Sequence, residues 1–308
     1  MTVFLNGGFV SRDEARVSAF DAGMTHGVGL FETMLGVRDE REPEGVRVVQ
    51  LAEHLERLGA SAKKTGLSED LRADRLGEAV LECVRRFFEE EAGRIGAERA
   101  RVRLTVTGGD LNLLETIGRR AEHTPTVLMS ATGATRYPDE MFERGVLLTI
   151  ADAKANPLDP LAGHKTLNYW WRLRELQAAG AKGAGEALVL QVTNHVAGGA
   201  VSNVFVVKDG GLVTPVAQGE EEAGALPSPV LPGVTRRGVL EFAEELGLPA
   251  RRRLVTVEDV LDADEVFLTN SSWGVLPVTR VERKEIGGGT VGEVTRRVRQ
   301  RWLEMVQG

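Results

Sequence analysis

His164-Lys165-Thr166-Leu167-Asn168-Tyr169 is the stretch that decides how the rest of this sequence is interpreted. The chain is rich in arginine and poor in lysine, so a lysine between a Gly-His turn and the expected start of a helix invites a chemical explanation. A deprotonated lysine amine attacks aldehydes, and partial burial lowers the pKa of lysines in that direction, whereas an arginine cannot form an imine. The alternative is a solvated lysine at a helix N-terminus, and the segment alone leaves both interpretations open.

The composition is that of an ordinary globular protein, with 308 residues of which 42% are hydrophobic and 27% are charged. This length is sufficient for two domains or one large one. A net charge of -7 gives no basic field for nucleic acid or an anionic membrane. No apolar run approaches the roughly 18 residues that span a bilayer, and the first residues do not resemble a signal peptide. The single cysteine, Cys83, fits the buried face of a helix, and no Cys/His cluster has zinc-site spacing, so we expect a cytoplasmic protein without a metal.

Hydrophobic periodicity divides the chain into two expected domains. Residues 1–131 predict a small α/β domain with helices at about 51–65 and 70–92 and strands at 101–107 and 126–129. Small and polar residues at 132–136 predict a linker. Residues 137–308 predict a larger domain, with helices at about 166–180, 235–246 and 290–306 and strands at about 145–150, 186–192, 203–208, 212–214 and 265–269.

Seven segments that follow one another along the chain resemble the class IV aminotransferases, a family of branched-chain aminotransferases, D-amino acid aminotransferases and aminodeoxychorismate lyases. They span nearly the whole chain and comprise residues 6–8, 21–33, 54–58, 165–169, 202–205, 231–236 and 265–271. The resemblance implies a two-domain α/β (α+β) fold-type IV enzyme, with a small N-terminal domain and a larger C-terminal domain that contains a barrel-like sheet. It also implies a homodimer that binds pyridoxal 5'-phosphate (PLP) between the two domains.

By this resemblance Lys165 forms the imine with the cofactor aldehyde and later moves the proton. Arg57 resembles the arginine that contacts the cofactor phosphate, and a guanidinium suits a dianion. Val234 and Thr235 match the phosphate loop at the start of a helix, where backbone N–H groups receive anions. For Arg57 the alternative is a solvated helix face, and for Thr235 it is a helix cap without a ligand.

Three further cofactor contacts are implied by the resemblance. Ser271 matches a third phosphate contact, Tyr169 resembles the tyrosine that hydrogen-bonds the ring oxygen, and Asn203 belongs to the Ser-Asn-Val-Phe segment. Tyr169 fits equally well as a core residue of an amphipathic helix, so its role stays open.

The family pattern breaks at one position. The family has a glutamate five residues before Asn203, where it keeps the pyridine nitrogen protonated, but this chain has Gly198 there with no gap before the Ser-Asn-Val-Phe segment. A protonated pyridinium stabilises the carbanion that Cα–H cleavage leaves. Losing such a charge-assisted hydrogen bond costs about 1.5–3 kcal/mol. Another group or water serves the nitrogen, or the reaction depends less on that electron sink, or the site has lost this chemistry.

Two other departures concern the substrate. Val28 stands where the family commonly has an acidic residue, and Thr107-Gly108-Gly109 replaces a Thr-Arg-Gly segment that supplies a carboxylate-binding arginine in some members. Arg103 and Arg136 are candidates for that arginine, although most arginines simply lie in solvent.

We therefore expect a PLP-dependent aminotransferase that moves an amino group between an amino acid and a 2-oxo acid through Lys165. The runner-up is an aminodeoxychorismate lyase-like enzyme that releases pyruvate, because the turn Thr269-Asn270-Ser271 is closer to lyase members. The third hypothesis is a non-catalytic or PLP-independent member of the fold. Gly198 favours this third hypothesis, and the surviving lysine, arginine and threonine argue against it.

Overall fold

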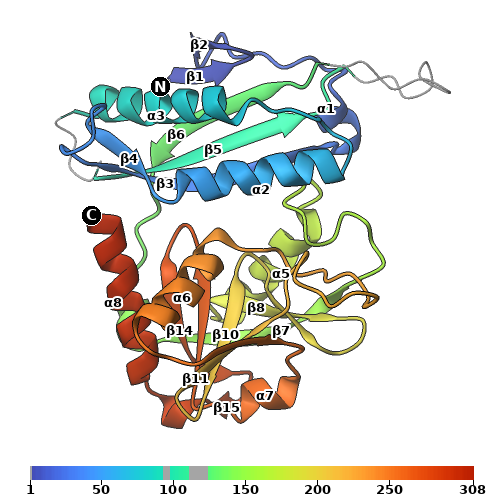
Figure 1. Ribbon diagram of the computed structural model, residues 1–308, viewed down its shortest axis with the longest axis vertical. Helices are drawn as coiled ribbons and strands as arrows, with labels where there is room; N and C mark the ends of the chain where they lie inside the picture. Colours follow the sequence, from blue (N-terminus) through green and yellow to red (C-terminus); the bar gives the residue numbers. More distant parts are fainter. Residues whose placement is uncertain (1, 93–97, 111–123) are drawn as a thin grey trace. The chain divides into compact units, whose positions relative to one another are not determined.

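The structure is a computed structural model that describes residues 2–92, 98–110 and 124–308 (Figure 1). Its internal contacts divide the chain into two units. Unit 1 comprises residues 1–135 and 164–168, and unit 2 comprises residues 136–163 and 169–308. The sequence predicted domains of residues 1–131 and 137–308, so the segment that carries Lys165 belongs by its contacts to the unit formed by the N-terminal part of the chain.

Unit 1 is built on a six-stranded antiparallel sheet in the order β2-β1-β6-β5-β3-β4. Two long helices, α2 and α3, pack on each other and against this sheet. The elements are β1 (Thr2–Leu5), β2 (Gly8–Ser11), α1 (Ala22–His26), β3 (Gly29–Arg38), β4 (Val46–Val48), α2 (Leu51–Lys64), α3 (Ala73–Glu90), β5 (Arg99–Thr107) and β6 (Val127–Gly133).

The core of unit 1 lies between these helices and the sheet. Leu58 of α2 and Val80 and Val84 of α3 are buried against strand residues such as Val102 and Leu104. Both helices carry apolar residues at helical spacing on the covered face, as the sequence pattern predicted. The predicted helices at 51–65 and 70–92 are thus confirmed, with ends shifted by one to three residues.

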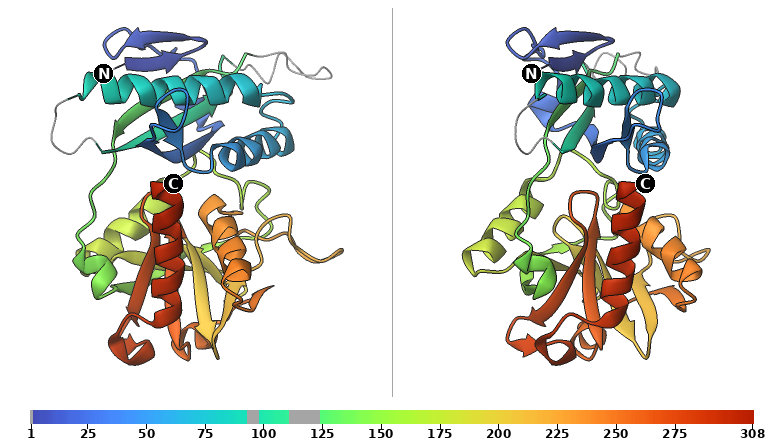
Figure 2. Two further views of the ribbon diagram at one scale, coloured as in Figure 1. Left: turned by 60° about the vertical axis from the view of Figure 1, so that its left-hand side comes forward. Right: turned by 90° about the vertical axis from the view of Figure 1, so that its left-hand side faces the viewer.

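Unit 2 is built on a mixed nine-stranded sheet in the order β12-β11-β10-β13-β14-β7-β8-β9, with β15 paired to β14. Strand β9, at one end of this order, also contacts β10 and β11, so the sheet curls into a half-barrel (Figure 2). The strands are β7 (Val146–Ala155), β8 (Glu186–Gln191), β9 (Val196–Gly199), β10 (Asn203–Lys208), β11 (Gly211–Pro215), β12 (Ala250–Arg253), β13 (Glu265–Asn270), β14 (Gly274–Val281) and β15 (Lys284–Glu285). This curled sheet confirms the expected fold class.

The helices of unit 2 pack against different parts of the sheet (Figures 1 and 2). Helix α5 contacts β7 and β8, whereas α6 and α8 contact each other and β13. The helical elements are α4 (Glu140–Glu143), α5 (Trp170–Ala181), α6 (Val234–Glu245), α7 (Val257–Leu261), the 3-10 turn η1 (Gly287–Gly289) and α8 (Glu293–Gln307). Within the described residues, no helix is long and apolar enough to cross a bilayer.

One predicted helix begins later than expected. The sequence predicted a helix from residue 166, but α5 begins at Trp170. Residues 165–167 are extended instead, because their backbone groups pair with β3 of unit 1: the N–H of Phe31 donates to the carbonyl of Lys165 at 2.9 Å, and the N–H of Leu167 donates to the carbonyl of Gly29 at 3.0 Å. Lys165 therefore does not lie at a helix N-terminus, and its expected chemical role stays a prediction.

The only cysteine of the chain gives a test of the unit 1 core. Cys83 lies on the buried face of α3, and burial raises the pKa of its thiol to about 12. We expect the native protein to resist alkylation at mildly alkaline pH, because the thiolate is the reactive form and reaction requires unfolding of unit 1. Mass spectrometry after iodoacetamide treatment, with and without denaturant, measures this. Native protein labelled as fast as the denatured control would show that α3 does not pack as described.

Candidate functional site

Lys165 is held in a short extended segment along β3. The two backbone hydrogen bonds to Phe31 and Gly29 flank it, and Leu30 pairs with Thr166 as an isolated antiparallel bridge. Only glycine fits at position 29. A Cβ there would lie 2.6 Å from the carbonyl oxygen of Val106 and 2.7 Å from the side chain of Leu167. The packing of β3 against β5 and against the side chain of Leu167 therefore depends on this glycine.

The side chain of Lys165 lies over a buried aromatic ring. Its Nζ is 4.4 Å from the ring centroid of Phe31, which is 3% exposed. The guanidinium carbon of Arg103 lies 3.4 Å from the same centroid, and Arg103 also donates from Nε to the hydroxyl of Thr105 at 3.3 Å. Cations are attracted to the negative face of an aromatic ring, so Phe31 orients both side chains. Of the two arginines predicted as candidates for the substrate carboxylate, Arg103 contacts the same ring as Lys165. The other, Arg136, is exposed.

The residue that follows Phe31 in β3 is Glu32, whose carboxylate is buried. Glu32 is 1% exposed and accepts hydrogen bonds from Arg57, at 2.8 Å from Nε and 2.5 Å from a terminal nitrogen, and it bonds Nδ1 of His54 at 2.8 Å. Burial alone would raise the pKa of Glu32, but the charge of Arg57 and the hydrogen bond of His54 outweigh burial and lower it to about 2. Glu32 is therefore an anion in the folded protein.

For His54, in contrast, burial is the dominant influence on the pKa. Burial lowers the pKa of its imidazole, the charges of Arg57 and Lys165 act in the same direction, and Glu32 opposes them. His54 and Arg57 lie one helical turn apart on α2, so a single helix delivers both groups to the carboxylate. Arg57, the predicted phosphate contact, is thus not a solvated helix residue, because its side chain is 10% exposed and paired with Glu32.

Four of the predicted cofactor residues come together in unit 2 at the N-terminus of α6. Gly233 is the N-cap and has no side chain to cap the helix, and Val234 and Thr235 are the first two helical residues. The hydroxyls of Thr235 and Ser271 lie 3.5 Å apart, and Asn203 donates from Nδ2 to the carbonyl of Leu231 at 2.9 Å. Thr235 lies inside the helix, so the alternative that it caps the helix is wrong. A helix N-terminus with two hydroxyls suits an anion.

Another polar side chain near this helix N-terminus, that of Thr269, was not among the predicted site residues. Thr269 pairs with Asn203 across the β10–β13 ladder, so their side chains share one face of the sheet. The Thr269 hydroxyl is buried and has no hydrogen-bond partner among the described residues. A Cβ on Gly233 would overlap the amide oxygen of Asn203, so the loop before α6 depends on a glycine there. The Thr269 hydroxyl is therefore a donor that the described residues leave unused, beside a helix N-terminus that suits an anion.

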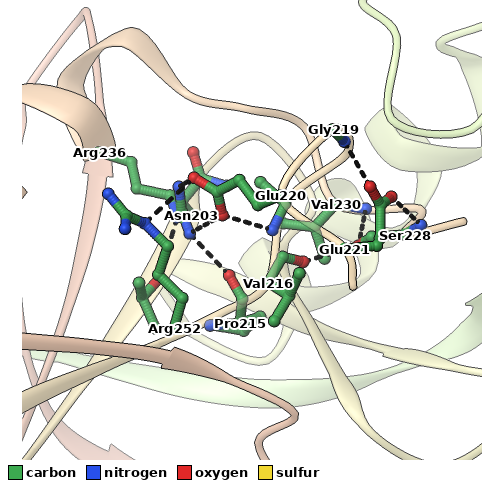
Figure 3. Close-up of polar contacts among 12 residues, drawn as sticks. Asn203, Pro215, Val216, Gly219, Glu220, Glu221, Ser228, Val230, Arg236 and Arg252 are labelled. Carbon is green, nitrogen blue, oxygen red and sulfur yellow. Dashed lines mark hydrogen bonds and ion pairs between the residues drawn. The ribbon is translucent and has the colours of Figure 1, made fainter. Parts of the chain in front are cut away.

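An ion pair and several hydrogen bonds hold the loop before α6 against the helix (Figure 3). Arg236, in the first turn of α6, donates to both carboxylate oxygens of Glu220 at 2.9 and 2.7 Å and to the carbonyl of Pro215 at 2.9 Å. The neighbouring Glu221 accepts the N–H of Ser228 at 2.5 Å. These contacts keep the first turn of α6 in one orientation, so its N–H groups point to a fixed location.

The start of α5 contains Tyr169 and Arg172, and Arg172 was not among the residues predicted from the sequence. Tyr169 is the N-cap residue of α5, and Arg172 follows one helical turn later. The guanidinium carbon of Arg172 lies 4.5 Å from the ring centroid of Trp171 and 5.9 Å from that of Tyr169. Residues three apart on a helix lie on the same face, so the spacing of Tyr169 and Arg172 could have predicted that they are neighbours. The predicted contact of Tyr169 with a cofactor oxygen stays a prediction.

Gly198, where the family pattern breaks, has a backbone conformation that favours glycine. Its φ is 144°, and a Cβ at this residue would lie 2.8 Å from the carbonyl oxygen of Ser202. Glu186 of the neighbouring strand β8 is fully buried, and its carboxylate accepts hydrogen bonds from the N–H of Ala187 at 2.9 Å, the N–H of Val201 at 3.1 Å and the hydroxyl of Ser202 at 3.1 Å. Burial raises the pKa of Glu186. This carboxylate holds the turn that follows Gly198.

The described residues contain no group of three or more His, Cys, Asp or Glu side chains arranged to hold a metal ion. Unit 1 thus contains an amine beside an aromatic ring and a buried ion-pair network. Unit 2 contains a helix N-terminus that suits an anion. An amine and an anion site are the two features that a phosphorylated aldehyde requires.

Comparisons with known proteins point the same way. A family model described as amino-transferase class IV matches residues 29–281. A putative branched-chain-amino-acid aminotransferase of Methanocaldococcus jannaschii is 30% identical over 99% of this chain and 96% of its own length. A branched-chain amino acid aminotransferase of T.th., solved with pyridoxamine 5'-phosphate, superposes with a TM-score of 0.82 and 27% identity over 98% of this chain and 93% of its own. The 4-amino-4-deoxychorismate lyase of Pseudomonas aeruginosa superposes with a TM-score of 0.79 and 28% identity over 98% of both chains.

The Glu32 network gives a test in unit 1. Glu32→Gln should lower the free energy of unfolding by about 3–5 kcal/mol, because it leaves the largely buried Arg57 guanidinium without its counter-charge. Since the folded state lowers the pKa of Glu32 from 4.5 to about 2, the stabilisation is complete above the unfolded pKa and is lost as pH falls through this window. The difference between wild type and variant should therefore shrink on acidification.

Urea unfolding of both proteins at several pH values measures this difference. Glu56→Gln, on the exposed face of α2, is the matched control and should change stability little. A pH-independent difference, or an equal effect of the control, would show that the ion pair does not form.

Proposed function

Because the chain belongs to the amino-transferase class IV family, we propose that Lys165 binds PLP covalently and that the enzyme transfers an amino group between an amino acid and a 2-oxo acid. The observation that carries this proposal is the location of the lysine: its backbone is paired with β3, and its Nζ lies 4.4 Å from the Phe31 ring. A fixed amine of this kind meets the geometric requirement for repeated attack at one carbon.

The residues of this chain fit the cofactor. The buried, unpaired hydroxyl of Thr269 and the glycine-capped start of α6 support phosphate binding by Val234, Thr235 and Ser271. Asn203 supports the loop before α6, and Tyr169 would donate to an oxygen of the cofactor ring. Arg57 would donate a hydrogen bond to the phosphate while its pairing with Glu32 fixes its orientation.

PLP, when bound, supplies an aldehyde that condenses with amines and a conjugated ring that takes up the electron pair released at Cα. Lys165 then has two tasks, which are to hold the cofactor between turnovers and to remove and return the Cα proton. The Phe31 ring excludes water from one side of the amine and limits its movement. The buried Glu32 compensates the charge of Arg57, so that the two groups together stay close to neutral.

A second candidate is a lyase that releases pyruvate from an amino-substituted chorismate. The structural similarity to the lyase of Pseudomonas aeruginosa supports it, as does the turn Thr269-Asn270-Ser271. Both activities use the same lysine and the same cofactor, so they differ in the product and not in the binding site. By family membership we also propose a homodimer, which light scattering would test.

Lys165→Ala should abolish covalent cofactor attachment and lower turnover at least ~100-fold, because it removes both the attacking amine and the proton carrier. Borohydride reduction followed by peptide mass spectrometry locates the attachment, and incubation with L-leucine or D-alanine should convert bound PLP to pyridoxamine 5'-phosphate with release of one 2-oxo acid. Lys182→Ala, an exposed lysine just after α5, is the control. Full turnover in Lys165→Ala would refute the proposal, and pyruvate release from an aminated chorismate without pyridoxamine formation would favour the lyase.

Thr235→Ala should weaken the binding of PLP to the apoenzyme roughly ten- to a hundred-fold, because it removes one charge-assisted hydrogen bond to the phosphate. Fluorescence titration with PLP, and with pyridoxal lacking the phosphate, measures the effect. Only the phosphorylated form should lose affinity, and Thr290→Ala, an exposed threonine, should bind both as wild type does. An equal loss for both forms would place the role of Thr235 outside phosphate binding.

A further inference from the structure

The backbone around Gly198 leaves no room for a carboxylate at this position. The φ of 144° is strained for any residue with a side chain, and the Ser202 carbonyl oxygen lies 2.8 Å from the position of a Cβ. The next residue, Gly199, is equally closed, because a Cβ there would overlap the Ser202 hydroxyl and approach Glu186. Glu186 is occupied by three hydrogen bonds to the same turn. None of these positions offers an acid to a ligand.

A cation lies beside this turn instead. Arg172 donates from a terminal nitrogen to the carbonyl of Ala200 at 3.2 Å, two residues after Gly198. Ala200 belongs to the apolar cluster of β8 and β9 that also contains Val189, the cross-strand partner of Gly198, and Trp171 of α5 packs against this cluster. Arg172 is therefore directed to the face of the sheet on which position 198 lies.

The charge of Arg172 has no ion-pair partner within 4.0 Å among the described residues. The side chain is half-buried; burial lowers the pKa of its guanidinium, and Tyr169 and the buried carboxylate of Glu186 oppose this shift. A guanidinium has five N–H donors, and one neutral acceptor at 3.2 Å satisfies one of them. Among the described residues, the buried side-chain atoms without a hydrogen-bond partner do not include the nitrogens of Arg172, so its remaining donors reach solvent and are accessible to a ligand. A ligand atom with a lone pair would accept a hydrogen bond from one of them.

We propose that Arg172 donates a hydrogen bond to the pyridine nitrogen of PLP, in place of the carboxylate that position 198 cannot hold. This inference rests on the proposed function, in which the chain binds PLP. A guanidinium donates and cannot accept, so the nitrogen keeps its lone pair and carries no proton. The ring then withdraws electrons less strongly, and the reaction depends more on the lysine that moves the proton.

Nitrogen-15 NMR tests this directly on the holoenzyme loaded with PLP labelled at the ring nitrogen. The wild type should give the signal of an unprotonated pyridine across the pH range in which the protein is stable. In Arg172→Leu the protonation midpoint of the ring nitrogen should rise by about 1–3 pH units, the change that a neighbouring charge produces. Arg172→Gln, which keeps a donor without the charge, gives the same test if the leucine variant does not fold.

The matched control is Arg174→Leu, an exposed arginine of the same helix, which should leave the NMR signal unchanged. A protonated nitrogen in the wild type would overturn the proposal, and so would a midpoint that stays unchanged in both Arg172 variants. A higher KM for the amino acid with an unchanged nitrogen signal would also overturn it, by assigning Arg172 to the substrate carboxylate. Failure to bind PLP at all would be detected beforehand by absorbance and would instead refute the proposed function.

Discussion

The pairing of residues 165–167 with β3 is the constraint on which the candidate site depends. Two backbone hydrogen bonds, at 2.9 and 3.0 Å, flank the lysine and hold it beside Phe31. Because backbone hydrogen bonds do not depend on the side chain, the position of the amine is set by the fold and not by its own flexible stem. The segment leaves unit 2 at Gly163 and returns to it at Tyr169, so five residues of the chain are incorporated into the other unit.

The two buried arginine environments show how differently one residue type is used. Arg57 is paired with Glu32, and His54 completes a network in which charge and hydrogen bonding are balanced. Arg172 has a single carbonyl acceptor and no carboxylate within ion-pair distance in the described part of the chain. The Arg57 network is satisfied within the chain, whereas Arg172 keeps donors that a ligand can use. If PLP binds as proposed, Gly198, where the sequence resemblance places a glutamate, and Arg172 both disfavour a protonated pyridine nitrogen.

Much of the fold was predictable because periodicity reports burial. The faces of α2 and α3, and the strands β5 and β10, follow directly from the spacing of apolar residues. The start of α5 was not predictable, because its first expected residues find stronger backbone partners on β3 than a helix would give them. The phosphate-binding residues were inferred from motifs, but Thr269 was missed, because a hydroxyl in a strand gives no sequence signal until its cross-strand neighbour is known.

The sequence by itself determined the family and the order of the elements, since these follow from residue identity and spacing. The role of Lys165 and the glutamate expected at Gly198 came from the resemblance and stay proposals. Only the tertiary structure decided that Lys165 lies in an extended segment, that Arg57 is paired with Glu32, and that Arg172 approaches the turn after Gly198. The reason is physical: a side chain's charge and hydrogen-bonding capacity are fixed by its chemistry, but its partners come from strands and helices that are distant in the chain. Those partners decide whether a charge is balanced or left for a ligand.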